Sequence, residues 1–178
     1  MKLRLGWMVV AMLSAVGGWA QTTWYVAPDG LESLGGAGWT DAFRSISNAV
    51  ARAQDGDTVL VSNGLYETAA QIAVTNAVLV RSWNQGALDR TGTVVRRSGA
   101  AVHRVFYINK AGATVAGFTI TNGVTVNSSQ FTRSGAGVFI DTQGGTLTNC
   151  LVTGNAATNN GYGGGVFCVT GTVANCVI

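Results

Sequence analysis

A short phrase occurs twice near the end of the printed sequence, and a looser copy of part of it lies upstream. The run Gly-Ala-Gly-Val-Phe at positions 135–139 returns as Gly-Gly-Gly-Val-Phe at positions 163–167. The run Thr-Leu-Thr-Asn-Cys-Leu-Val at positions 146–152 returns as Thr-Val-Ala-Asn-Cys-Val-Ile at 172–178, and positions 114–120 have the same shape. A period of roughly 30 residues, rich in β-branched side chains and glycine, predicts a solenoid whose turns are short strands.

Short apolar runs continue this pattern upstream, separated by glycine, asparagine and serine. They occupy residues 58–61, 72–74, 78–80, 94–95, 102–108 and 114–120. The runs follow one another too closely for crossover helices, and parallel strands without such helices require a coiled chain. We therefore predict an all-β fold, a parallel β-helix over residues 58–178.

The repeat also predicts which side chains face the interior and which lie at bends. The inward set is Val115, Phe118, Ile120, Leu147, Cys150, Val152, Val173, Cys176 and Ile178, with Val138 and Ile140 stacked on Val166 and Cys168 on another face. Gly117, Asn149 and Asn175 fall at one bend, where these residue types tolerate a left-handed backbone. We expect stacked asparagine side chains to bond from turn to turn at this bend.

The three cysteines lie within the repeats. Cys150 and Cys176 hold equivalent positions on successive turns, about 4.8 Å apart. That Cα spacing is compatible with a disulfide, but parallel Cβ vectors leave the Cβ atoms slightly too far apart. We expect Cys150 and Cys176 to be reduced and buried, with Cys168 inward on a different face; a Cys150–Cys176 disulfide is the alternative.

Residues 1–20 have the features of a signal peptide. Lys2 and Arg4 precede an uncharged run, and Gly18-Trp19-Ala20 supplies small residues for cleavage. The run is short for a membrane span, although an uncleaved anchor is the alternative. Without this leader the chain carries a net charge near +1, which gives no reason to expect a nucleic-acid partner. We expect a secreted or cell-surface protein with no transmembrane segment in its mature part.

Residues 21–57 form an N-terminal region of strand, loop and one helix. We predict the helix over residues 41–53, capped by Thr40 or Asp41. Its apolar positions, Phe43, Ile46, Val50 and Ala53, are spaced by three and four positions and form one stripe.

Residues 23–61 resemble the opening of bacterial right-handed parallel β-helix proteins of the pectate-lyase-like superfamily. The resemblance is carried by Trp-Tyr-Val at 24–26, Gly-Trp-Thr-Asp-Ala-Phe at 38–43 and the run at 55–61. The glycine and Asn-Cys phrases resemble repeats of bacterial surface β-helix proteins, including polymorphic outer membrane proteins. The resemblance implies a right-handed parallel β-helix whose first turn is capped by the helix. Because residue 178 falls inside a repeat, we expect a fragment that lacks its C-terminal turns.

Enzymes of that superfamily are mostly polysaccharide lyases and glycosidases, which use clustered carboxylates. Asp141 is the only acidic residue between Arg90 and Ile178. Asp55 and Asp57 lie close together, but we interpret them as a strand-entry turn after the helix. We expect no catalytic residue, cofactor or metal ligand in this sequence.

The basic residues allow two interpretations. Arg96, Arg97, Arg104 and Lys110 could form a solvated strand face or a site for an acidic glycan. His103 has no histidine or cysteine at metal-ligand spacing, so we interpret it as structural.

Two segments, 122–134 and 153–162, are longer than a minimal coil requires and should emerge on the same side. Phe131, Arg133 and Tyr162 are suited to stacking on sugars and are the candidate ligand-binding residues, although tolerated insertions would also explain the lengths. The leading hypothesis is an exported structural or adhesive stalk or passenger whose partner is carbohydrate or another cell surface. The alternative is a polysaccharide lyase or glycoside hydrolase whose catalytic residues lie outside these residues.

Overall fold

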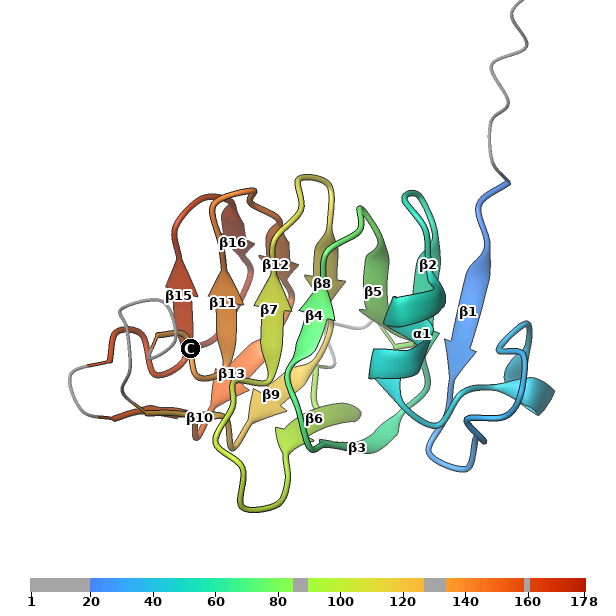
Figure 1. Ribbon diagram of the computed structural model, residues 1–178, viewed down its shortest axis with the longest axis horizontal. Helices are drawn as coiled ribbons and strands as arrows, with labels where there is room; N and C mark the ends of the chain where they lie inside the picture. Colours follow the sequence, from blue (N-terminus) through green and yellow to red (C-terminus); the bar gives the residue numbers. More distant parts are fainter. Residues whose placement is uncertain (1–19, 85–89, 127–133, 159–160) are drawn as a thin grey trace, which may run out of the picture.

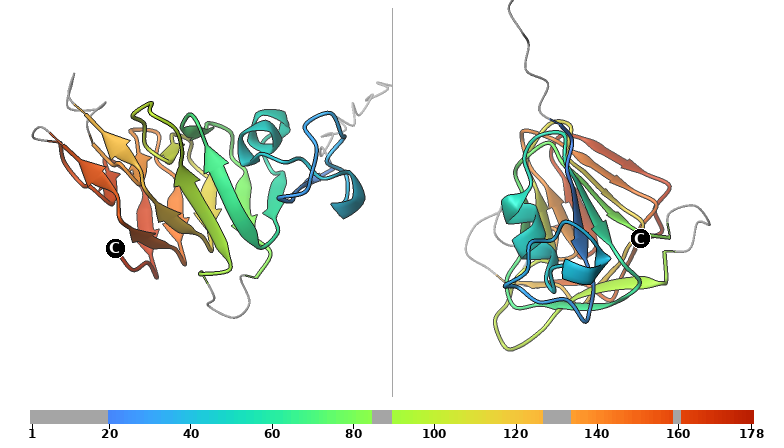
Figure 2. Two further views of the ribbon diagram at one scale, coloured as in Figure 1. Left: turned by 90° about the horizontal axis from the view of Figure 1, so that it is seen from below. Right: turned by 90° about the vertical axis from the view of Figure 1, so that its right-hand side faces the viewer.

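The structure is a computed structural model that describes residues 20–84, 90–126, 134–158 and 161–178. Its strands form a parallel β-solenoid of about four turns, which confirms the predicted all-β parallel β-helix (Figure 1). Seen along the axis, three sheets enclose a common core (Figure 2).

Within each sheet, neighbouring strands come from successive turns. The longest contains β1 (Thr23–Val26), β2 (Thr58–Val61), β5 (Leu79–Ser82), β8 (Thr114–Ala116), β12 (Thr146–Thr148) and β16 (Thr172–Ala174). A second contains β3 (Gly64–Thr68), β6 (Thr93–Arg97), β9 (Thr119–Thr121) and β13 (Leu151–Thr153). The third contains β4 (Ile72–Val74), β7 (Phe106–Ile108), β11 (Val138–Ile140) and β15 (Val166–Cys168), and β10 (Val124–Thr125) pairs with β14 (Ala156–Ala157) beside it.

The register confirms the stacking predicted from the repeat. Leu147 lies between Val115 and Val173, and Val138 lies beside Val166. Most of the predicted inward set is buried in one continuous core, namely Val115, Phe118, Ile120, Val138, Ile140, Leu147, Cys150 and Val152. Burial of these stacked β-branched and aromatic side chains is the main source of stability in such a coil.

The last described turn departs from this prediction. Val173 is 38% exposed, and Ile178 and Cys168 are exposed as well. Their register places them on the same faces as buried residues of the turn before, but no described residue stacks on their far side. The predicted burial of these three residues is therefore wrong for this structure. Val166 and Cys176, predicted to be buried as well, are only partly buried against the core. All three cysteines are free, as expected.

The bend after the longest sheet has the predicted backbone. Asn149, Asn175 and Gly117 have φ values of 52°, 53° and 82°. The asparagine ladder is not formed: among the described residues, the bonds that cross between turns here are made by the backbone, as from Asn149 N to Ala174 O (3.2 Å). Asn149 is half-buried and Asn175 exposed, so water can satisfy both side-chain amides.

The helix is shorter than predicted. α1 spans Ile46–Arg52, with Ser45 as its N-cap, and a 3₁₀ turn, η1, spans Trp39–Asp41. Phe43 is not helical because its backbone pairs with β1: Phe43 N donates to Tyr25 O, and Phe43 O accepts from Ala27 N, both at 2.9 Å. This pairing covers the free edge of β1, which would otherwise expose unpaired backbone groups.

The burial predicted for the helix region is correct. Phe43, Ile46, Val50 and Ala53 are all buried in the core. α1 lies at the N-terminal end of the solenoid, next to β4 in Figure 1, and packs against β1, β2 and β4. Across the described segments, no helix has the length and apolarity needed to cross a membrane.

The repeated glycine phrase has a backbone cause. Gly135 and Gly163 have φ values of 61° and 60°, and a Cβ at either would collide with a carbonyl oxygen, that of Val138 or Val166 respectively. Only glycine fits such a bend without strain. Gly135 N donates to Tyr162 O (2.9 Å), so the phrase also joins one turn to the loop of the next.

Candidate functional site

The paired carboxylates near the helix are structural. Asp57 is buried and accepts from Thr22 N (2.8 Å), Trp24 Nε1 (2.9 Å) and Gln54 N (2.9 Å). Asp55 accepts from Ala77 N and pairs with Lys110 at 3.4 Å. These contacts agree with the interpretation of Asp55 and Asp57 as a strand-entry turn.

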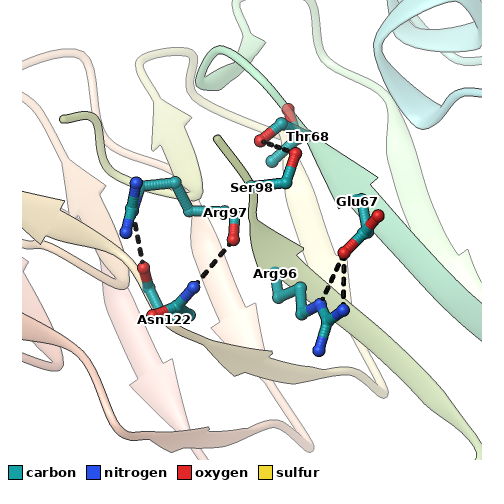
Figure 3. Close-up of polar contacts among 6 residues, drawn as sticks. All are labelled: Glu67, Thr68, Arg96, Arg97, Ser98 and Asn122. Atoms are coloured by element: carbon teal, nitrogen blue, oxygen red, sulfur yellow. Dashed lines mark hydrogen bonds and ion pairs between the residues drawn. The ribbon is translucent and has the colours of Figure 1, made fainter. Parts of the chain in front are cut away.

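Most of the basic residues are occupied by neighbouring groups (Figure 3). Both Nε and Nη2 of Arg96 donate to Glu67 Oε1, at 2.9 and 2.5 Å. Arg97 Nε donates to Asn122 O (2.9 Å), while Asn122 Nδ2 donates to Arg97 O (2.9 Å). Arg97 Nη1 also bonds two carbonyls of the following loop. This surface therefore resembles the solvated strand face rather than an anion site.

Arg104 differs from Arg96 and Arg97 in its burial, since it is only 7% exposed. Its guanidinium carbon lies 4.6 Å from the centre of the Phe139 ring and 5.9 Å from that of Tyr107. Burial lowers the pKa of Arg104, although the nearby Tyr107 and Asp141 oppose the shift. Such cation–π stacking holds the side chain against the sheet.

These rings belong to an aromatic stripe, which we define as Tyr107, Phe139 and Phe167. The three residues are in register on β7, β11 and β15, and they alternate with inward-facing residues, so they lie on the outer face of that sheet. Successive ring centres are 5.9 and 5.5 Å apart, with interplanar angles of 30° and 25°. Tyr162 extends the row, with its ring centre 6.2 Å from that of Phe167.

Polar groups border the stripe at Tyr107. The Tyr107 hydroxyl donates to Asp141 Oδ2 (2.7 Å), and Asn109 Oδ1 accepts from Gln143 N (2.9 Å). Burial, together with the bond to Asp141 and its negative charge, raises the pKa of Tyr107 to about 12. Asn109 and Val169 occupy the positions next to Asp141 on the adjacent turns, so neither supplies a second carboxylate.

The two long segments emerge together as predicted. β10 pairs with β14, Gly123 N donates to Asn155 Oδ1 (2.8 Å), and Thr158 N donates to Thr125 O (2.9 Å). Of the three candidate ligand-binding residues, Phe131 and Arg133 lie outside the described residues. Tyr162 is described and is 51% exposed at the end of the aromatic stripe.

The stripe itself was not predicted from the sequence. The sequence does carry a signal for it: Tyr107, Phe139 and Phe167 occupy outward positions of the repeat and recur at nearly the same interval as the repeated phrases. That interval predicts stacked rings as directly as the inward positions predict a core.

Other surfaces are less suited to ligands. Tyr25, Trp39 and Trp83 form a second exposed aromatic cluster near the N-terminal end, but their rings meet edge-to-face at 76° and 82°. A groove of about 400 Å³ lies between α1 and β3. Its acidic groups are engaged, because Glu67 pairs with Arg96 and Glu32 accepts from Asn48.

His103 is a part-buried residue beside β7. Its Nδ1 lies 2.8 Å from Arg104 O, and its Nε2 is buried without a hydrogen-bond partner. In the part of the chain that the structure describes, no three histidine, cysteine, aspartate or glutamate side chains are grouped to hold a metal ion.

In comparisons with known proteins, no family model, curated protein or solved structure matches this chain. The class that the fold defines is the parallel β-solenoid.

Proposed function

We propose that this chain is an exported, secreted or cell-surface β-helix that serves as a structural or adhesive stalk and binds carbohydrate through the aromatic stripe and Tyr162. The leader-like residues 1–20 support export. The resemblance to bacterial pectate-lyase-like β-helices and to repeats of polymorphic outer membrane proteins supports a bacterial surface role.

The continuity of the stripe with Tyr162 carries this proposal. Aromatic rings offer apolar faces to the C–H groups of sugars, and their hydroxyls, with nearby amides and carboxylates, bond sugar hydroxyls. Tyr162 is exposed and Phe167 is partly exposed, while Tyr107 and Asp141 form a polar border at the other end of the row. Phe139 is only 1% exposed beneath Arg104, so contact falls on the two ends of the row.

The electrostatics favour a neutral glycan. Arg96 and Lys110 already pair with carboxylates, and Arg97 bonds backbone carbonyls. An acidic polysaccharide would have to break these contacts to gain a counter-charge, whereas a neutral one leaves them in place.

We propose binding without cleavage. Hydrolysis of a glycosidic bond requires two carboxyl groups separated by roughly 5 to 10 Å. Asp141 borders the stripe with Asn109 and Val169 on either side. A lyase or glycoside hydrolase remains the alternative function, and the same experiment distinguishes it.

The test is incubation of the purified protein with a panel of neutral and acidic polysaccharides, with binding followed by affinity electrophoresis. We expect retardation by at least one neutral polysaccharide and no release of reducing or unsaturated ends. Release of such ends would show an enzyme, and retardation by none of the panel would refute carbohydrate binding.

A further inference from the structure

Two thiols meet on the last two turns, away from the aromatic stripe. Leu151 and Val177 form a parallel bridge, and Val177 N donates to Cys150 O (2.9 Å), so Cys150 and Cys176 are direct neighbours on adjacent turns. Both are free. Cys150 is fully buried, with Leu147 and Phe118 in the same core, and Cys176 is partly exposed.

The spacing of turns suits a bridging atom better than a direct bond. Neighbouring parallel strands lie about 4.8 Å apart. A disulfide draws its Cβ atoms to roughly 3.8 Å, which stacked cysteines reach only with distortion. Two metal–thiolate bonds of roughly 2.2 Å each, slightly shorter than in a tetrahedral zinc site, give a sulfur–sulfur span of about 4.4 Å in a linear site. The natural separation of the turns is therefore close to that of a linear dithiolate.

Both thiols lie against backbone oxygens at this bend, and a positive charge lies close by. Cys150 Sγ lies 3.2 Å from Thr148 O, and Cys176 Sγ lies 3.2 Å from Ala174 O and 3.7 Å from Leu147 O. Arg90 Nη1 lies 3.5 Å from Cys150 O, so its guanidinium can balance part of the negative charge of a metal-bound thiolate pair.

We propose that Cys150 and Cys176 form a two-coordinate binding site for a soft monovalent metal ion, Cu(I). Thiolates select this ion over hard cations. In binding, each thiol loses its proton to solvent as its sulfur forms a bond to copper. Tetrahedral zinc would need two further ligands, and the described residues bring no third histidine, cysteine or carboxylate to the pair.

The experiment is an anaerobic titration of the full chain with Cu(I) in competition with bathocuproine disulfonate. Cys168→Ser serves as the reference protein, because Cys168 is exposed on a different sheet and could bind copper non-specifically. We expect one Cu(I) per chain and X-ray absorption showing two sulfur neighbours at about 2.2 Å, slightly closer than in a tetrahedral zinc thiolate site.

Removing either sulfur should weaken Cu(I) binding by roughly 100-fold or more. Cys176→Ser is the decisive variant because its site is partly exposed and the change should not prevent folding, which circular dichroism can check. Unchanged affinity in Cys176→Ser, three or more ligands to copper, or failure of the reference protein to compete with the chelator would each overturn the proposal. Loss in Cys176→Ser with folding intact supports it, whatever the fate of Cys150→Ser.

Discussion

Asp57 joins two segments through one carboxylate. It accepts hydrogen bonds from Thr22 N and the Trp24 indole at β1, and from Gln54 N at the end of the helix region. Burial disfavours the charged form, but the three donated hydrogen bonds outweigh it and hold the pKa of Asp57 below its ordinary value. Because the folded pKa is lowered, this stabilisation is complete above the unfolded pKa, about 4. The stabilisation is lost as the pH falls through the lowered pKa of Asp57 in the folded protein.

We therefore predict that Asp57→Asn lowers the free energy of unfolding at pH 7 by about 1–3 kcal/mol, because an amide cannot accept all three bonds. The variant should also lose the part of the acid dependence that lies below about pH 4. Urea unfolding between pH 2 and 7 measures both effects. Asp29→Asn, at an exposed position, is the matched control. Equal stability of the Asp57 variant and this control at pH 7 would contradict the assignment.

The left-handed backbone at Asn149 leads to a second prediction about a single residue. Alanine at a φ of 52° should cost about 1–2 kcal/mol, whereas glycine should be nearly neutral. The comparison of Asn149→Ala with Asn149→Gly by urea unfolding isolates the backbone from the lost amide. If both variants lose the same stability, the side chain and not the backbone conformation matters at this bend.

At the scale of elements, the sequence predicted what the helix region buries better than where the helix begins. The spacing of Phe43, Ile46 and Val50 correctly identified an apolar face. It could not show that the Phe43 backbone pairs with Val26, because that pairing depends on the edge of a strand formed earlier in the chain. Tertiary pairing of this kind overrides local helix propensity.

We predict that Ile46→Asp destabilises the protein by several kcal/mol, because it places an unpaired charge between α1 and the first turn. Ala51→Asp is the matched control, since Ala51 is exposed on the same helix and the change should cost less than about 0.5 kcal/mol. Thermal unfolding of the two variants provides the measurement. A melting temperature for Ile46→Asp equal to that of the control would show that α1 does not contribute to the core.

At the scale of the whole molecule, repeats in the sequence were sufficient to predict the coil, most of its inward residues and its left-handed bend. They did not predict the burial of Arg104, because that depends on the Phe139 ring of the following turn. The period of the aromatic stripe is present in the sequence, but the alternation of inward and outward positions does not by itself predict that outward rings stack on one another. Val173 and Ile178 are exposed at the last turn although their equivalents in earlier copies are buried, because the repeat predicts the direction of a side chain and not what stacks on it.

The most direct measurement compares two double variants in affinity electrophoresis on the neutral polysaccharide that retards the wild type most. Tyr162→Ala/Phe167→Ala removes the exposed end of the stripe, and Trp39→Ala/Trp83→Ala removes the other exposed aromatic cluster. We predict that the first variant binds the polysaccharide with an affinity about 10-fold lower or more, since stacking on two rings contributes roughly 1.4 kcal/mol or more to the binding free energy. The second should retain it. Loss of binding in the tryptophan variant with retention in the stripe variant would contradict the proposed site.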